Sequence, residues 1–146
     1  MNEQVKNANF SLQGFKVTEF HFVEAPIEYD VLNVDFNPSG CFDENTSIYS
    51  LDLIFTGSVS NKNGEKIDSV IATFKAFFYF SEKILAKDLP PFFYINSIAI
   101  VYPYLRAFIT TVTLQTQSKV MILPIMNLSA LEPILRQKTT VITKEG

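Results

Sequence analysis

Hydrophobic and polar residues alternate with a period of two over most of the first 80 residues, which is the pattern of half-buried β-strands. The clearest case is residues 49–59, where the odd positions are mostly apolar and serine, aspartate and threonine stand between them. Similar stretches at 15–24, 29–37 and 66–80 predict three more strands. The last becomes apolar on both faces at 74–80. We therefore expect one face of it to pack on a second layer and the other on a partner or another subunit.

Turn-forming residues separate the predicted strands. An Asn-Gly pair, Asn63-Gly64, lies between the third and fourth strands, and this pair between strand patterns is a strong signal for a hairpin. Pro26 separates the first two strands. Residues 38–45 contain a proline and a glycine, so they predict a loop.

The period changes to helical spacing after residue 80. Apolar side chains recur every three or four residues at Ile98, Val101, Leu105, Ile109 and Val112. Pro103 interrupts this pattern, so the helix is expected to start near Tyr102 or to kink there. A second, short helix is predicted from about Ser129, which has capping-box spacing with Glu132. Four strands followed by two helices predict an α+β fold, with a four-stranded antiparallel sheet and a long and a short C-terminal helix packed on one face.

Size and composition indicate one folded domain. The chain has 146 residues, which fits a single domain with polar tails at about 1–10 and 139–146. Apolar residues make up 47% and charged residues 18%, which excludes wholesale disorder. Fourteen phenylalanines and six tyrosines occur without tryptophan. Such an excess of aromatic side chains predicts a dense core, an apolar surface that something else covers, or some of each.

Charge and targeting signals narrow the function classes. Residues 1–60 carry a net charge of −7 and the remainder +4, with only two arginines in the chain. Nucleic-acid binding needs clustered basic residues, so no nucleic-acid partner is expected. The acidic half would face a basic partner or simply form a solvated surface. Residues 1–10 are polar, unlike a secretory signal, and the apolar run at 98–105 is short for a membrane span. We therefore expect a cytoplasmic protein without stable membrane insertion.

Residues suited to catalysis or metal binding are few. His21 is the only histidine, and it shares a strand face with Glu19. Such a pair can perform acid–base chemistry, but a lone strand histidine is also common in structural or surface positions. Glu19, His21 and Glu24 match no known metal geometry, and the single Cys41 forms neither an internal disulfide nor a metal cluster. No nucleophile elbow or phosphate loop is present, so no enzymatic activity, cofactor or metal is expected.

Three short segments match motifs of one known family, in the order that this family has them. Residues 102–106 read Tyr-Pro-Tyr-Leu-Arg, which resembles the motif that leads into the long helix of the protein-export chaperone SecB. Residues 123–131 read Leu-Pro-Ile-Met-Asn-Leu-Ser-Ala-Leu, which resembles the approach to the last SecB helix. Residues 22–26, Phe-Val-Glu-Ala-Pro, look like the end of the first SecB strand with one extra residue.

The resemblance implies an ATP-independent holdase of the cytoplasm that binds unfolded or precursor polypeptides and delivers them to the SecA motor. It also implies a homo-oligomer, a dimer or a tetramer. By position, the client-binding residues would be Leu32, Val34, Phe36, Leu128, Leu131 and Leu135. The alternative for these six is core packing between sheet and helix. Structural roles in helix orientation and subunit packing are implied for Tyr104 and Arg106.

In this family SecA docks on an acidic sheet surface, and Glu19 and Glu24 match that pattern by position. A third acid of the family pattern is missing, since Ile71 lies near its place, and Leu128 replaces the usual aromatic residue. These departures suit a divergent member, including a dedicated partner-binding chaperone of a toxin–antitoxin system. A third hypothesis is a small-ligand-binding or enzymatic α+β domain, which needs a closed polar pocket around His21.

Overall fold

The computed structural model describes residues 9–25, 31–116, 120–124 and 126–143. Its elements in chain order are β1 (Phe10–Phe22), β2 (Val31–Asp43), β3 (Ile48–Ser60), β4 (Lys66–Phe80), the single 3-10 turn η1 (Ala86–Asp88), α1 (Pro91–Gln115), α2 (Leu131–Gln137) and β5 (Thr139–Ile142).

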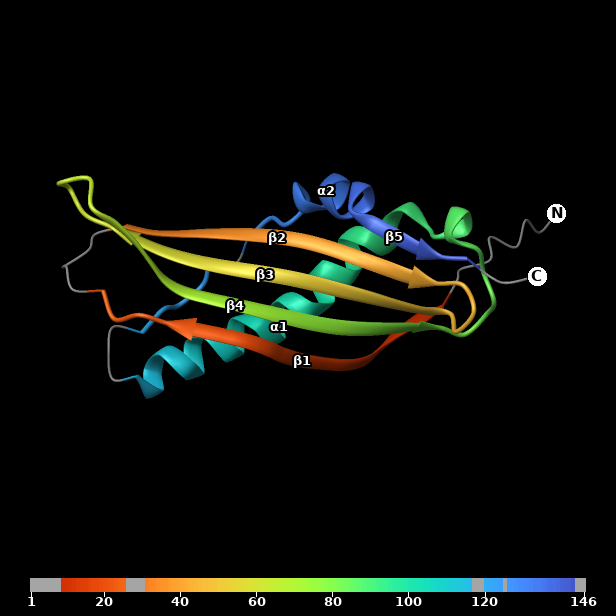
Figure 1. The fold of residues 1–146 in the computed structure, drawn as a ribbon, viewed down its shortest axis with the longest axis horizontal. Helices are drawn as coiled ribbons and strands as arrows, with labels where there is room; N and C mark the ends of the chain where they lie inside the picture. Colours follow the sequence, from red (N-terminus) through yellow and green to blue (C-terminus); the bar gives the residue numbers. More distant parts are fainter. Residues whose placement is uncertain (1–8, 26–30, 117–119, 125, 144–146) are drawn as a thin grey trace.

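The strands form one sheet in the order β1-β4-β3-β2-β5. The four long strands pair antiparallel, and β5 pairs in parallel with the end of β2. Figure 1 shows α1 running diagonally across one face of this sheet, with α2 beside β2. The predicted α+β class, with a long and a short helix on the sheet, is confirmed, although the sheet has five strands rather than four.

Two of the predicted boundaries at the edge of the sheet are wrong. The expected loop at 38–45 is mostly strand, because β2 continues through Pro38 and Gly40 to Asp43. A proline lacks the N–H of a ladder bond but is tolerated where one side of a strand has no neighbouring strand. The expected polar tail forms β5 at its start, where Thr139–Ile142 pair with Gly40–Asp43. Pro26 lies outside the described residues.

The hairpin between β3 and β4 is confirmed at the Asn-Gly pair. The side-chain oxygen of Asn61 accepts hydrogen bonds from the backbone N–H groups of Asn63 and Glu65, at 3.0 and 3.1 Å. Gly64 has a φ of +81°, which only glycine adopts without steric cost. Local turn chemistry thus sets the register in which β3 meets β4.

Helix α1 begins much earlier than the proline suggested. It starts at Pro91, where the missing N–H costs nothing, and continues through Pro103 without ending. Its sheet-facing residues are buried along its whole length, from Phe93 to Thr113. Burial on this scale outweighs the cost of about 3 kcal/mol for one internal proline.

By length and composition alone, α1 also passes as a membrane span, although the sequence pattern predicted none. Packing against the sheet accounts for the apolar residues on its inner side.

The start of α2 differs from the predicted capping box. The helix begins at Leu131 after Ala130, and no side chain caps it. Ser129 contributes its backbone carbonyl, which accepts the N–H of Glu132 at 3.2 Å, rather than its hydroxyl. The Ser129 hydroxyl is not needed as a cap, because the Glu132 N–H group already donates to a backbone carbonyl.

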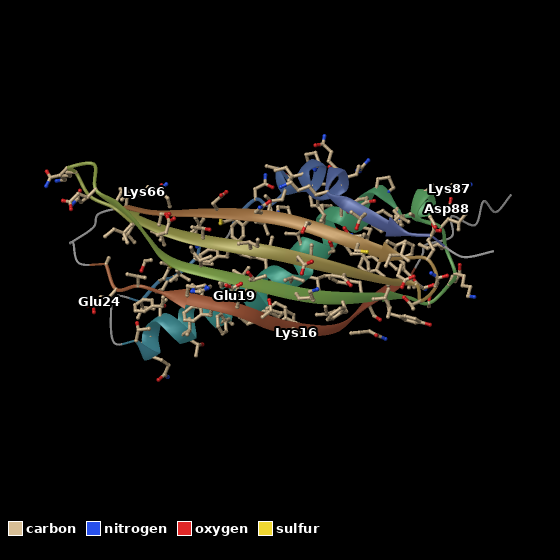
Figure 2. The ribbon with its side chains drawn as sticks, in the orientation of Figure 1. Lys16, Glu19, Glu24, Lys66, Lys87 and Asp88 are labelled. Carbon is tan, nitrogen blue, oxygen red and sulfur yellow. The ribbon has the colours of Figure 1, made fainter. Side chains whose placement is uncertain are left out.

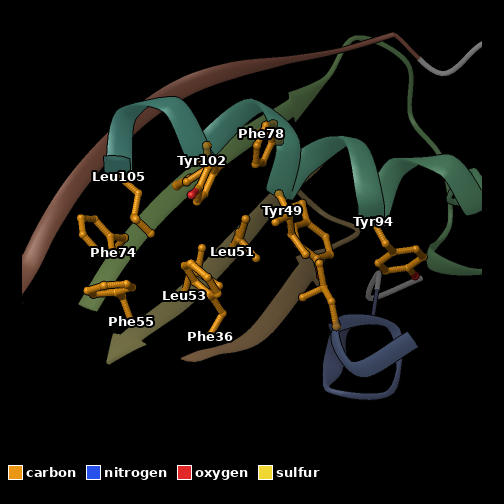
Figure 3. Close-up of a cluster of buried hydrophobic side chains, with 14 of the residues drawn as sticks. Phe36, Tyr49, Leu51, Leu53, Phe55, Phe74, Phe78, Tyr94, Tyr102 and Leu105 are labelled. Atoms are coloured by element: carbon orange, nitrogen blue, oxygen red, sulfur yellow. The ribbon is translucent and has the colours of Figure 1, made fainter. Parts of the chain in front are cut away.

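An aromatic layer fills the space between α1 and the sheet. The Phe93 ring of α1 is fully buried, and its centroid lies 4.7 Å from that of Tyr49, 4.8 Å from Phe10 and 5.0 Å from Phe80. Figure 3 shows labelled side chains from both sides of this layer, with Tyr49, Phe74 and Phe78 on the strands and Tyr94 and Tyr102 on α1.

The end of β4 divides its aromatic side chains between the two faces of the sheet. Phe74, Phe78 and Phe80 point into the core, whereas Phe77 is half-buried and Tyr79 is 39% exposed. The prediction that one face of this strand packs on a second layer is therefore confirmed. Its second half, a partner or another subunit on the other face, stays a prediction.

Gly40 allows one core side chain to cross a strand. Tyr49 of β3 is fully buried, and its hydroxyl reaches over β2 to the Thr139 hydroxyl of β5, at 2.6 Å. A Cβ on Gly40 would lie 2.0 Å from the Tyr49 hydroxyl oxygen. Two atoms this close would overlap, so any other residue at position 40 would force the tyrosine to move. Burial raises the pKa of Tyr49, so its phenol stays protonated and shares a hydrogen bond with Thr139.

Phe93→Ala tests the aromatic layer. The substitution removes a ring that touches both the sheet and its own helix, and we expect a loss of about 3–5 kcal/mol in the free energy of unfolding, measured by urea denaturation. Ile122 is 64% exposed and provides the control. Ile122→Ala should cost about 1 kcal/mol or less, and equal losses for the two variants would contradict this packing.

Gly40→Ala tests the crossing of Tyr49 over β2. The added methyl group must displace the tyrosine ring, so we expect a loss of about 1–3 kcal/mol in the free energy of unfolding. Gly14 on β1 is the control, because a Cβ there would meet only Phe77 Cδ2 at an ordinary 3.7 Å. If Gly14→Ala proved the more destabilising change, the close approach at Gly40 would not be a constraint.

Candidate polypeptide-binding site

An apolar row lies on β2, on the face of the sheet that α1 covers. Leu32, Val34 and Phe36 pair in register with Val59, Gly57 and Phe55 of β3. Leu32 and Val34 are half-buried, while Phe36 is 8% exposed. The row is therefore buried at Phe36 and more accessible at Val34 and Leu32, nearer the start of β2.

Phe36 forms the inner end of this row. Its ring centroid lies 5.5 Å from that of Phe55 and 6.0 Å from that of Tyr102 on α1. These contacts assign Phe36 to the core, where it supports the more open positions at Leu32 and Val34.

Helix α2 and the residues before it contribute the second wall. Leu135 is fully buried, whereas Leu128 and Leu131 are half-buried against the same hydrophobic core. Of the six residues singled out in the sequence, Phe36 and Leu135 thus belong to the hydrophobic core, and the other four pack against it. We call the four half-buried members, Leu32, Val34, Leu128 and Leu131, the apolar shelf. Its role in binding polypeptides stays a prediction.

The edge of β2 adds a feature that the hydrophobic pattern could not indicate. Among the described residues, no strand pairs with Val31–Ser39 on the side away from β3, since β5 covers only Gly40–Asp43. An open edge presents unpaired backbone donors and acceptors to another extended chain. Which strand lies at an edge depends on the strand order, and alternation along one strand carries no information about that order.

The two candidate SecA contacts lie on or just beyond β1. Figure 2 shows Glu19 on the strand and Glu24 past its end. The Glu19 side chain is 63% exposed, and its Oε1 lies 2.6 Å from His21 Nε2. The structure places these two acids along one edge strand and does not bring them into contact with each other.

The outer face of the sheet is mixed in charge rather than acidic. Lys16 of β1 pairs in register with Lys75 of β4, and both ammonium groups lie over the Phe77 ring, at 5.6 and 6.0 Å from its centroid. Lys75 also contacts Asp52, at 3.5 Å. The two lysines offset much of the negative charge that Glu19 and Asp52 bring to this face.

His21 has no enclosed surroundings. Its side chain is 61% exposed and faces solvent beside Glu19. The hypothesis of a small-ligand or enzymatic site in a closed polar pocket around His21 is therefore wrong. Within the described ranges, no group of three histidine, cysteine or carboxylate side chains is placed to hold a metal ion.

The outward side of α1 is a second apolar surface. Arg106 is the single charged residue of this 25-residue helix, and Phe92, Ile100, Tyr104 and Leu114 are exposed on it. An open hollow of about 380 Å³ lies along this side, lined by Tyr102, Pro103, Arg106, Ala107, Thr110 and Thr111.

Two tyrosines of α1 connect the helix to its surroundings. The Tyr104 ring packs 5.5 Å from that of Phe15 of β1, and the Tyr102 hydroxyl donates to the carbonyl of Pro124 at 2.6 Å. The first contact ties the helix to an edge strand, and the second ties it to the segment that leads to α2. Both are consistent with a structural role for this part of α1.

Comparison with known proteins identifies the fold through structure alone. A scan of the sequence against protein-family models finds no match, and a search of the curated proteins finds none either. A protein of unknown function from Streptococcus agalactiae covers 80% of this chain and 98% of its own, with 13% identity and a TM-score of 0.38. That score is too low to support a shared fold.

A second solved structure is much more similar. It is the SecB-like chaperone Rv1957 of Mycobacterium tuberculosis, in complex with a ChAD peptide from the HigA1 antitoxin. The superposition has a TM-score of 0.67 and covers 82% of this chain and 92% of that one, at 13% sequence identity. The order of strands and helices and this superposition show that the chain shares the fold of this SecB-like chaperone.

Proposed function

We propose that this protein is an ATP-independent holdase of the cytoplasm that binds non-native polypeptides. The observation that carries the proposal is the apolar shelf beside the open edge of β2. An unfolded chain can bury apolar side chains on Leu32, Val34, Leu128 and Leu131 while its backbone pairs with the edge. Neither interaction reads a particular sequence, as a chaperone with many clients requires.

A binding surface of this kind needs side chains that stay in place when no client is bound. Phe36 and Leu135 are buried, and the half-buried side chains of the apolar shelf pack against the hydrophobic core that contains them. A disordered client loses conformational entropy when it binds. A preorganised surface on the chaperone adds little further entropy cost to that loss. No nucleotide is needed for such a passive mechanism.

A second candidate is a chaperone dedicated to one partner, such as the antitoxin of a toxin–antitoxin system. It is favoured by the likeness to Rv1957, whose structure holds an antitoxin peptide. The two candidates share the apolar shelf and differ in selectivity. Affinity purification that returns one stoichiometric partner supports the dedicated chaperone, and recovery of many precursors supports the general holdase.

A narrower version of the holdase adds delivery of clients to SecA, with Glu19 and Glu24 as its contacts. Both carboxylates lie on the accessible surface, as docking requires. Lys16 and Lys75 occupy the same region of the sheet, and they would repel a basic partner. The charge pattern therefore supports client binding without SecA more strongly than it supports export.

We also propose that the protein is a homo-oligomer, a dimer or a tetramer. A helix that is apolar on all sides is usually buried on all sides, and α1 has a single charge in 25 residues. The sheet covers one side of it. A second copy would cover Phe92, Ile100 and Tyr104 on the other side, which leaves the apolar shelf on β2 and α2 free for clients.

The apolar shelf predicts how client binding depends on two of its residues. We expect the protein to suppress aggregation of a chemically unfolded model protein at near-stoichiometric amounts, without nucleotide, as measured by light scattering. The double variant Leu32→Ser/Leu131→Ser should need about ten-fold more protein for half-suppression, because each leucine is already half-buried and gains only about 0.7 kcal/mol when a client covers the rest of it.

The control for this experiment is Val31→Ser/Ile134→Ser. Both residues are exposed and lie next to or within the same elements, but outside the apolar shelf. This double variant should suppress aggregation as the unaltered protein does. Urea denaturation of both double variants checks that they remain folded at the assay temperature. No suppression by the unaltered protein at several-fold excess would rule out the holdase.

The outward side of α1 predicts an oligomer that a single charge disrupts. Light scattering coupled to size exclusion should give the mass of a dimer or tetramer at micromolar concentration. Ala107→Glu places a carboxylate on the exposed side of α1 and should shift the mass toward the monomer, since an unpaired charge is costly to bury. Asn63→Glu adds the same charge in the β3–β4 turn and should leave the mass unchanged. A monomeric unaltered protein would contradict the proposal.

A further inference from the structure

Strand β5 is a small, separately held element at the end of the sheet. It has four residues, pairs only with β2 among the described strands, and runs parallel to it. Thr140, Val141 and Ile142 are exposed, with Ile142 at 50%. Because it buries so little apolar surface, backbone and hydroxyl hydrogen bonds rather than core packing hold it in place.

Those hydrogen bonds include the ladder with β2, a bond from the Thr140 hydroxyl to the Gly40 carbonyl at 3.4 Å, and contacts at the two ends of β5. At its start, the Gly40 N–H donates to the Lys138 carbonyl at 3.2 Å, and the Tyr49 hydroxyl donates to the Thr139 hydroxyl. At its end, the Glu44 N–H donates to the Ile142 carbonyl at 2.9 Å.

The Thr139 hydroxyl also donates to the Leu135 carbonyl, at 2.7 Å, which ties β5 to the last turn of α2. Leu135 itself is fully buried. Release of β5 would therefore break its four-residue ladder with β2 and these side-chain contacts, while α2 stays anchored by Leu135.

We propose that β5 is an internal strand that competes with client backbone for the end of the β2 edge. With β5 in place, only Val31–Ser39 is open for pairing; with β5 released, the open edge extends to Asp43. The inference rests on the proposed function and deepens it, because it specifies where and in which direction a client segment pairs.

The slot that β5 leaves has a definite chemistry. It accepts an extended segment parallel to β2, and the sequence Thr-Thr-Val-Ile of β5 indicates β-branched residues that fit a half-exposed strand position. The buried Tyr49 hydroxyl faces the first position of the slot, so a client residue with a hydroxyl there replaces the contact of Thr139. The class of segment that fits best is thus β-branched and uncharged, with serine or threonine first.

The position of Cys41 allows β5 to be locked with one introduced cysteine. Cys41 on β2, the only cysteine, is the direct register partner of Thr140 on β5. Neighbouring strands lie about 4.8 Å apart, within the range that a disulfide spans. Thr140→Cys therefore allows one bridge that closes the slot under oxidation by oxidised glutathione and opens it on reduction. Mass spectrometry distinguishes the internal bridge from a bridge between chains.

The test measures binding of fluorescently labelled, reduced and carboxymethylated α-lactalbumin, a permanently unfolded protein that lacks free thiols. Oxidised T140C should bind about ten-fold more weakly than the same variant after reduction, because two or three backbone hydrogen bonds to the client are lost. T140S, which forms no bridge, should bind equally under both conditions. Equal binding by oxidised and reduced T140C would overturn the proposal.

Hydrogen exchange separates this inference from the proposed function. In the unaltered protein, the amides of Gly40 and Glu44 should exchange faster than those of β3 and β4, and Thr139→Val should accelerate them about ten-fold by removing the Tyr49 contact. If the unaltered protein does not bind the unfolded probe, the proposed holdase function is refuted. Slow exchange at Gly40 and Glu44, unchanged by Thr139→Val, refutes an exchangeable β5 even if the probe binds.

Discussion

The packing of α1 against the sheet through aromatic side chains is the constraint on which the rest of the structure depends. Phe93 contacts rings from β1, β3 and β4 at once, so it holds three strands and the helix in one arrangement. Large rings in edge-to-face contact tolerate few alternative geometries, because a shift that improves one contact opens another. The position of α1 on the sheet follows from this layer.

That position determines which apolar residues are left incompletely covered. α1 crosses the sheet diagonally, and its Tyr102 ring reaches Phe36 but leaves Leu32 and Val34 half-buried at the start of β2 (Figure 1). Met121 and Leu123 cover part of the remaining sheet, and Gly57 provides room for the Met121 sulfur. The apolar shelf is therefore the boundary of the core rather than a separate pocket. A surface of this origin is suited to binding apolar segments without a fixed sequence.

Local patterns predicted those features that neighbouring residues determine. Alternation from Tyr49 to Val59 identified the buried face of β3 because its side chains meet one layer and solvent lies opposite. The Asn63-Gly64 turn was predictable because its backbone geometry needs a glycine. Pro103 led to a wrong prediction of the helix start. The prediction counted the hydrogen bond that a proline removes, but not the burial of the helical residues before and after Pro103, which offsets that loss. The hydroxyl of Ser129 likewise looked like a cap but is not used as one.

Sequence patterns were enough to predict the α+β class, the hairpin, the apolar faces of the strands and, through three short segments, the likeness to SecB. Each of these depends on residues close together in the chain. Tertiary structure alone decided that Tyr49 passes over Gly40 to meet Thr139, that a polar C-terminal segment becomes β5, and that the edge of β2 stays open beside the apolar shelf. Strand order and edge exposure arise from contacts between residues far apart in the chain, such as Thr140 and Gly40, which are 100 positions apart and leave no periodic signal along the chain.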